Sequence, residues 1–75
     1  MTIKVDLHLR SNPSEDHHSL GMVPVEIHGI QLAPYQEIAC LVDGRHIRAQ
    51  ITSLHQRGSH LPRVYADEVH ADALA

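Results

Sequence analysis

The sequence predicts an all-β fold, in which about five strands form a small barrel or a compact two-sheet roll. Three observations support this prediction: apolar and polar residues alternate in several segments, an Asp-Gly turn separates two of them, and no segment has convincing helical spacing. The 75 residues suffice for one small domain. We expect it over residues 1–69, with residues 70–75 as a C-terminal tail.

The central element is a β-hairpin over residues 36–54. Asp43 and Gly44 suit a type I′ turn, in which both central residues have positive φ. Counting outward from this turn places Cys40 opposite Ile47 and gathers apolar residues on one face. A shift by one residue would mix the two faces, so the turn and the pattern specify the same register. The predicted apolar face contains Ile38, Cys40, Val42, Ile47, Ala49 and Ile51.

Two strands and a loop precede the hairpin. Residues 2–9 alternate between apolar and polar side chains, which predicts a half-buried strand. Residues 10–21 are rich in polar and turn-forming residues, so we expect a mobile surface loop. Residues 22–28 alternate again, but Pro24 has no amide hydrogen to donate. We therefore expect this strand at a sheet edge, or with Pro24 on an unpaired side.

The hairpin is followed by one more strand. The alternation changes side at Ser53 and Leu54, which predicts a bend or bulge that lets one strand serve two sheets. Residues 55–61 should form a loop, and residues 63–69 the final strand. The inward face of that strand contains one of two pairs, Val64 with Ala66 or Tyr65 with Val69.

Charge and cysteine content limit the function classes. A formal net charge of −3 with six Lys and Arg argues against a general phosphate-binding surface, although protonation of all eight histidines would move the charge to +5. Cys40 is the only cysteine, so no disulfide forms within the chain. We expect a cytoplasmic protein, because the N-terminus does not resemble a signal peptide and no stretch approaches the length of a membrane span.

Histidine is the unusual residue type of this chain. His8, His28 and His46 point outward from three predicted strands, and three converging imidazoles would suffice for a zinc site with one open position. His17 and His18 form a second candidate. Because none of these spacings is diagnostic, we favour solvated surface histidines and expect no cofactor.

A nucleic-acid surface is the second alternative. Its candidate residues are Arg45, His46, Arg48 and Arg57. We favour the alternative that Arg48 pairs with Glu37 across the hairpin, because no aromatic residue lies among these cations to stack on bases.

Residues 41–56, LVDGRHIRAQITSLHQ, resemble the corresponding stretch of Sm-like RNA-binding proteins. The strand count by itself fits an SH3-like or related small barrel. The resemblance implies an Sm-like barrel, which is five-stranded and bent and assembles into rings. It covers about a fifth of the chain, and we transfer no RNA-binding residue from it.

Catalysis is not indicated. The adjacent carboxylates Asp67 and Glu68 lie on a predicted strand and would point to opposite faces, and there is no Gly-rich phosphate loop. We therefore expect a protein that is not an enzyme.

Eight apolar residues have no assigned place in the core: Leu20, Met22, Ile30, Leu32, Tyr35, Leu41, Leu54 and Leu61. They either cap the ends of the barrel or form an exposed patch, and such a patch marks an interface more often than not. We expect a non-enzymatic interaction module that self-associates or serves as an accessory subunit of a larger assembly, with strand addition at the Pro24 edge as one mode. The candidate interface residues are Met22, Pro24, Ile30, Leu32, Tyr35, Leu41 and Leu54.

Overall fold

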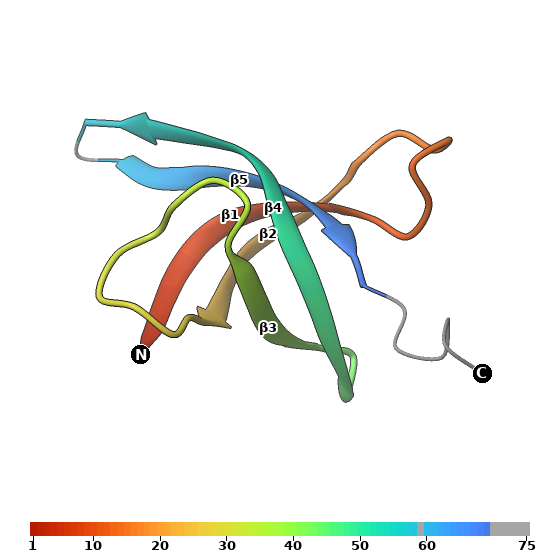
Figure 1. Cartoon of the computed structure of the whole chain (residues 1–75), viewed down its shortest axis with the longest axis horizontal. Coiled ribbons are helices and arrows are strands. Elements are labelled where there is room, and N and C mark those ends of the chain that lie inside the picture. Colours follow the sequence, from red (N-terminus) through yellow and green to blue (C-terminus); the bar gives the residue numbers. More distant parts are fainter. Residues whose placement is uncertain (59, 70–75) are drawn as a thin grey trace.

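The computed structural model describes residues 1–58 and 60–69, and it confirms the all-β prediction (Figure 1). The expected tail over residues 70–75 lies outside the described residues. Within the described residues, five strands form a closed ring in sequence order. They are β1 (Thr2–Arg10), β2 (His18–Glu26), β3 (Glu37–Val42), β4 (Arg45–Arg57) and β5 (His60–Glu68). Consecutive strands pair antiparallel, and because their number is odd, the ring closes with β1 and β5 parallel.

The central hairpin has the predicted register. Cys40 lies opposite Ile47, and the pairing continues from Val42 and Arg45 at the turn to Glu37 and Gln50. The φ angles of Asp43 and Gly44 are 51° and 79°, as a type I′ turn requires. Turn chemistry and hydrophobic pattern therefore determine this part of the fold together.

The core fills the inside of the ring with aliphatic side chains. In β5 the inward pair is Val64 and Ala66, both with 0% of their surface exposed. Cys40 is also buried and carries a free thiol. Among the described residues, no polar or charged side chain is buried in this core. The buried set consists of Val5, Leu7, Leu9, Val25, Ile27, Ile38, Cys40, Ile47, Ala49, Ile51, Val64 and Ala66.

β2 begins earlier than predicted, because a bulge continues the strand through residues that favour turns. The pairing with β1 shifts register beyond Leu7, next to Gly21, whose φ is 75°. A bulge admits an extra residue without ending the ladder, so β2 extends back to His18. The expected loop over residues 10–21 is thereby reduced to residues 11–17.

β4 pairs with β3 on one side and with β5 on the other, and it has the irregularity that the change of alternation at Ser53 and Leu54 predicted. Its pairing with β5 shifts register between Ile51 and Ser53, and again between His55 and Arg57. The expected loop over residues 55–61 is instead mostly strand, because β4 runs to Arg57 and β5 starts at His60.

The ladder between β2 and β3 is short, and Pro24 explains why. It contains only two residue pairs, Val25 with Cys40 and Glu26 with Ala39. The next pair in this register would be Pro24 with Leu41. Ile27 donates its amide hydrogen to Met1 of the β1 side, so odd-numbered residues of β2 bond toward β1 and Pro24 faces β3. Pro24 has no hydrogen to donate there, and the ladder ends.

A candidate interaction surface on the loop between β2 and β3

The loop over residues 27–36 joins two strands that are paired at only two positions, and it is the long yellow connection in Figure 1. Residues 29–36, GIQLAPYQ, contain no Asp, Glu, Lys or Arg. Its far end is fixed to β4: the Tyr35 amide donates to the Ile51 carbonyl (2.9 Å), and the Ile51 amide donates to the Gln36 carbonyl (2.8 Å). The loop is therefore uncharged over residues 29–36 and anchored to β4 at its C-terminal end.

A tight turn at residues 33–36 holds Tyr35 in an unusual backbone conformation. The Gln36 amide donates to the Ala33 carbonyl (3.3 Å), and the Gln36 side chain accepts from the Ala33 amide (3.1 Å). Tyr35, with a φ of 67°, is the third residue of this turn and follows Pro34. Proline at the second position and positive φ at the third are typical of a type II turn, in which the third residue is normally Gly or Asn. A tyrosine there is under backbone strain.

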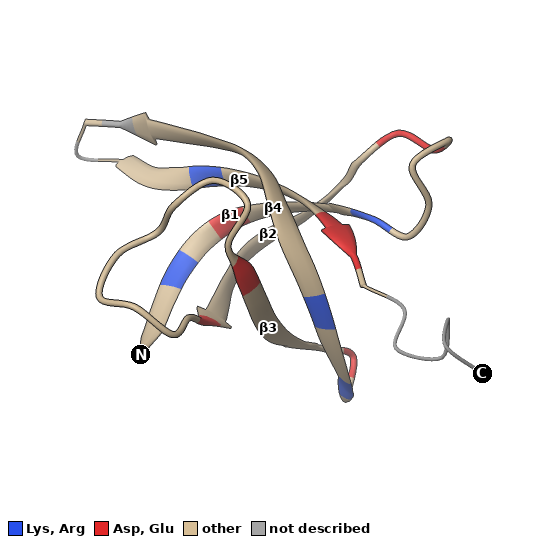
Figure 2. Ribbon diagram, in the orientation of Figure 1, with Lys and Arg blue, Asp and Glu red and all other residues tan. Residues whose placement is uncertain are grey.

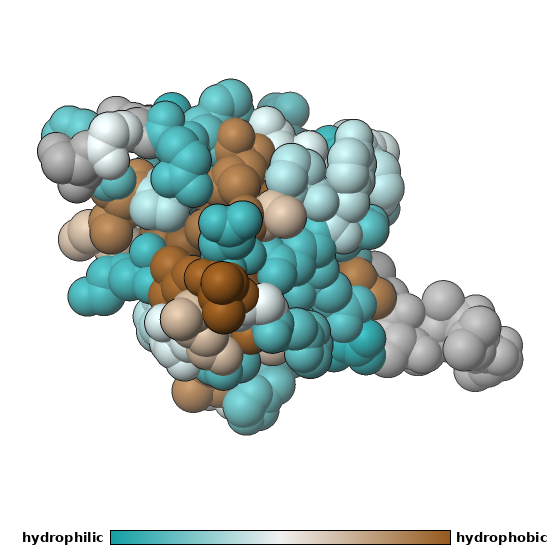
Figure 3. All heavy atoms as spheres, turned by 60° about the vertical axis from the view of Figure 1, so that its left-hand side comes forward, coloured by the Kyte–Doolittle hydropathy of each residue, from teal (hydrophilic) through white to brown (hydrophobic). Residues whose placement is uncertain are grey.

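The loop presents its apolar side chains to solvent. Ile30 and Tyr35 have exposed fractions of 84% and 73%, the two largest among the exposed large hydrophobic residues. Leu32 differs, because it is half-buried and packs against the core. Figure 3 shows apolar surface gathered near the middle of the face on which this loop lies, with hydrophilic residues around it.

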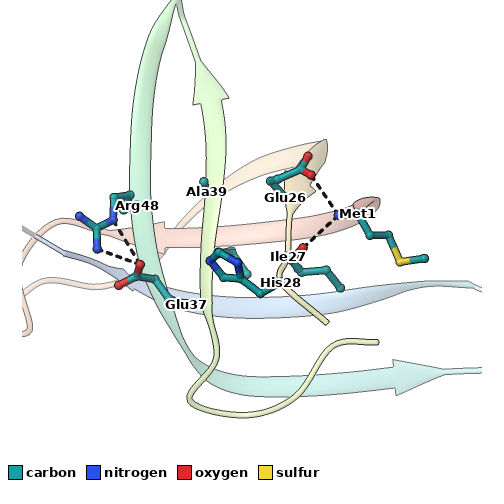
Figure 4. Close-up of a pocket in the computed structure, with 8 residues that line it drawn as sticks. Met1, Glu26, Ile27, His28, Glu37, Ala39 and Arg48 are labelled. Carbon is teal, nitrogen blue, oxygen red and sulfur yellow. Dashed lines mark hydrogen bonds and ion pairs between the residues drawn. The ribbon is translucent and has the colours of Figure 1, made fainter. Parts of the chain in front are cut away.

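A groove of 520 Å³ lies at the base of the loop, where β2 and β3 diverge (Figure 4). Its charged groups neutralise one another: the Met1 ammonium contacts Glu26 (3.0 Å), and Arg48 contacts Glu37 (2.8 Å). His28 lies between these two pairs in the view of Figure 4. The groove is lined by Met1, Glu26, Ile27, His28, Glu37, Ile38, Ala39 and Arg48.

Hydrogen bonding stabilises the charged form of Glu26 at the rim of this groove. The Thr2 hydroxyl donates to one carboxylate oxygen, and the Met1 ammonium donates to the other. The Thr2 hydrogen bond and then the ammonium group lower the pKa of Glu26 from its ordinary value. Glu26 therefore stays ionised and paired.

The other predicted interface residues lie elsewhere. Pro24 and Leu41 line a second groove of 330 Å³ along β2 and β3, next to the end of their ladder. Met22 lines a third groove, of 250 Å³, with Asp6 as one of its neighbours. Leu54 is half-buried and packs against the core. The structure thus divides the predicted set, and only Ile30, Leu32 and Tyr35 belong to the loop.

The histidines considered as an alternative metal site do not converge. His8 stacks on Tyr65, whereas His28 and His46 line two different grooves. The pair His17 and His18 separates as well, because His17 contacts Asp67 and Tyr65 while His18 begins β2. Within residues 1–58 and 60–69, no group of three or more His, Cys, Asp or Glu side chains is placed to hold a metal ion.

A polar cluster on the outer face of β1 and β5 was not predicted from the sequence. The rings of three histidines surround Tyr65: His8 is stacked at 4.7 Å, and His17 and His55 meet it edge-on at 5.3 and 5.8 Å. The parallel ladder also aligns Arg10 with Asp67. The alternating polar residues of β1 and β5 could have indicated this cluster. They do so only once the two strands are known to pair with each other.

Arg10 and Asp67 form the best-defined ion pair of this cluster. The Arg10 guanidinium donates to both carboxylate oxygens, at 2.6 and 3.1 Å, and His17 lies 3.3 Å from the same carboxylate. The hydrogen bond from Arg10 is the main cause that lowers the pKa of Asp67. This pair fastens the end of β1, and with it the loop over residues 11–17, to β5.

The candidate nucleic-acid residues do not form one positive surface. Arg48 donates two hydrogen bonds to Glu37 across the hairpin, at 2.8 and 3.2 Å. Arg45 follows the hairpin turn with His46 beside it, whereas Arg57 lies at the far end of β4. Figure 2 shows basic and acidic residues interspersed along the hairpin of β3 and β4.

Ser53 and His55 are the described residues that come nearest to a catalytic pair. The Ser53 hydroxyl lies 3.0 Å from His55 Nε2, which suits a nucleophile and a base. His55 also meets Tyr65 edge-on, and neither Ser53 nor His55 lines any of the three grooves. This pair lacks the orienting carboxylate of a hydrolytic triad among its described contacts.

Comparison with known proteins found no matching family model, no significantly similar curated protein and no significantly similar solved structure. The likeness of residues 41–56 to Sm-like proteins therefore assigns no function. In the described part of the chain, no helix has the length and apolar character needed to cross a lipid bilayer.

Proposed function

We propose that this protein is a non-enzymatic protein-protein interaction module that binds through the loop over residues 27–36. The strained backbone of Tyr35 is the observation on which the proposal depends. A non-Gly residue in this conformation costs on the order of 1 kcal/mol or more. The Tyr35 side chain gains little from the core in return, because 73% of its surface is exposed.

The chemistry of the loop suits a protein partner. Tyrosine is enriched among the residues that dominate binding energy, and Ile30 adds a second exposed apolar side chain. Residues 29–36 contain no charged side chain whose desolvation would oppose burial. The hydrogen bonds between Ile51 and residues 35 and 36 fix the backbone at Tyr35 before a partner arrives, which reduces the entropy cost of binding at this residue.

The first test separates strain from binding in solution. Tyr35→Asn and Tyr35→Gly should each raise the free energy of unfolding by about 1 kcal/mol in urea denaturation, because both residues accept positive φ more readily. A decrease in stability would show that Tyr35 serves the fold and would contradict the proposal.

The second test identifies the partner. A photo-reactive phenylalanine analogue placed at position 30 should give a crosslinked adduct in cells, and Tyr35→Asn should abolish that adduct. The control carries the same analogue at His18, which is exposed and begins β2 eight residues before Glu26, about 26 Å along the strand at about 3.3 Å per residue. No adduct at position 30, or the same adduct at position 18, would overturn the proposal.

A further inference from the structure

We propose that the open edge of β2, residues 22–24, takes an extended, uncharged and apolar segment of another protein as an additional strand. This surface lies outside the loop over residues 27–36 and does not depend on it. β2 pairs with β1 from end to end, but with β3 only at Val25 and Glu26. Within the described residues, β2 therefore has no strand partner on its β3 side before Val25, and the bulge next to Gly21 leaves residues 22–24 as the regular part of this edge.

The hydrogen-bond pattern shows which backbone groups lie on the open edge. Met1 and Ile27 exchange two hydrogen bonds, at 2.8 and 3.0 Å. Such pairs recur every second residue in an antiparallel ladder, so the odd-numbered residues of β2 beyond the bulge bond to β1, and Met22 and Pro24 face the other way. The open edge therefore offers the amide hydrogen of Met22 and the carbonyl oxygens of both residues.

The hairpin places the backbone of Leu41 on the opposite side of the same gap. A two-residue turn is flanked by a pair that exchanges both hydrogen bonds, which here is Val42 with Arg45. Even-numbered residues of β3 thus bond to β4, and the amide and carbonyl groups of Leu41 face β2. Because Pro24 has no hydrogen to donate to Leu41, the gap starts between these two residues, which both line the groove of 330 Å³.

An extended backbone is the complement of these groups. The outward-facing groups of Met22 and Pro24 are two residues apart, roughly 6.6 Å at about 3.3 Å per residue, and a neighbouring strand presents its own donors and acceptors at this spacing. Charged residues commonly protect a sheet edge against such pairing. Residues 18–25 and 38–42 contain no Asp, Glu, Lys or Arg, so both sides of this gap lack that protection.

The side chains around the gap determine the chemistry of the added strand. On the outer face, Met22 and Leu41 have exposed fractions of 69% and 56%. On the inner face, Val23 and Val42 are half-buried and pack against the core. Because successive side chains of a strand alternate between its two faces, the bound segment would meet apolar neighbours on both. A charged side chain would lose hydration there, so the segment that fits is apolar and uncharged.

A second copy of β2 matches this edge less well than a different chain does. If two β2 edges paired, each would contribute a Pro24, and two amide donors would be missing from the new ladder. A partner strand without proline leaves only one donor missing. The edge therefore favours a different protein over self-association.

The test uses a synthetic peptide, acetyl-KVTVTVTK-amide, whose six central residues are uncharged and β-branched. Added to isotope-labelled protein, it should cause saturable NMR shifts at Met22, Val23 and Leu41, and should slow deuterium exchange of the Met22 amide roughly tenfold or more. The control is the same peptide N-methylated at its six central residues. It keeps the side chains but donates no backbone hydrogen bond from this region, so it should cause neither change.

A substitution removes the protein's side of the same hydrogen bonds. Met22→Pro deletes the amide donor on the side that β1 does not use, and it should weaken peptide binding roughly fivefold or more. Met22→Ala keeps the amide and should weaken binding less than Met22→Pro does. Circular dichroism checks that both variants are folded. The N-methylated peptide tests these hydrogen bonds in the wild-type protein, so the result does not depend on the folding of a variant.

Four outcomes would overturn the inference. Three concern the peptide: no saturable binding, equal binding of the N-methylated peptide, or shifts confined to the loop over residues 27–36. The fourth is protection of the Met22 amide that rises with protein concentration in the absence of peptide, because it would identify a second copy as the occupant. The proposed function fails separately, since its tests act at Ile30 and Tyr35 and use no peptide.

Discussion

His8 and Tyr65 lie opposite each other across the parallel ladder of β1 and β5, and their rings stack at 4.7 Å with an interplanar angle of 23°. The contact joins the first strand of the chain to the last. His17 and His55 complete the ring of imidazoles around Tyr65, from the segment before β2 and from β4. One half-buried tyrosine therefore connects four segments on the outside of the ring.

Tyr65→Ala should lower the free energy of unfolding by about 2 kcal/mol, because it removes three aromatic contacts and the apolar area of the ring. Tyr65→Phe keeps the ring and should stay within about 0.5 kcal/mol of wild type. Urea denaturation at neutral pH measures both changes. Equal effects of the two substitutions would show that the hydroxyl, and not the ring, is important.

Asp67→Asn should lower the free energy of unfolding at pH 7 by about 1 kcal/mol, because it weakens a two-point ion pair with Arg10. The pKa of Asp67 is lowered in the folded protein, chiefly by Arg10. The stabilisation is therefore complete above the pKa of the unfolded state, near 4, and is lost as the pH falls through the lower folded pKa. The stability difference between wild type and Asp67→Asn should shrink across this acidic range, as denaturation at a series of pH values would reveal. A difference that stays constant down to about pH 2 would contradict the assignment.

Gly44→Ala should destabilise the protein by about 1–2 kcal/mol, because the φ of Gly44 is 79°. A Cβ atom there would have no neighbour within 4 Å, so the cost comes from the backbone and not from a clash. Asp43→Asn is the matched control, since Asn also tolerates positive φ, and it should change stability by less than about 0.5 kcal/mol. Thermal unfolding of the three proteins measures this; an unaffected Gly44→Ala variant would exclude the type I′ turn.

Pro24→Val should extend the ladder between β2 and β3, because valine supplies the amide hydrogen that faces Leu41 in this register. We expect the new amide to exchange slowly with deuterium. The overall free energy of unfolding should change by less than about 1 kcal/mol, since the added hydrogen bond is offset by greater freedom of the unfolded chain. Rapid exchange at position 24 would show that another cause separates the strands.

The sequence predicted the parts of the fold that depend on residues close to one another in the chain. The hairpin register was predictable because Asp43 and Gly44 fix the turn and the alternation fixes the faces. The bend after Ile51 was visible as a change in alternation. The start of β2 was missed, because pairing with β1 and the bulge at Gly21 outweigh the turn preference of the local residues.

The candidate surface was predicted only in part. Ile30, Leu32 and Tyr35 were identified as apolar residues without a core position, but the sequence did not separate them from Met22, Pro24 and Leu41, which lie on other grooves. The positive φ of Tyr35 was not predicted, because the turn at residues 33–36 depends on hydrogen bonds to Ile51 and from Gln50. The cluster around Tyr65 requires the parallel ladder, whose partners are 57 residues apart at Arg10 and Asp67.

Because β1 and β5 pair across a separation of 57 residues, the order of synthesis determines when the ring can close. The ring can close only when β5 reaches β1, and the buried Val64 and Ala66 belong to this last strand. Until residues 60–68 have been synthesised, the nascent chain can form the hairpin but leaves its aliphatic interior open on one side. We therefore expect the ring to close only once β5 is free to pair with β1, at the millisecond-to-second rates of proteins dominated by long-range contacts.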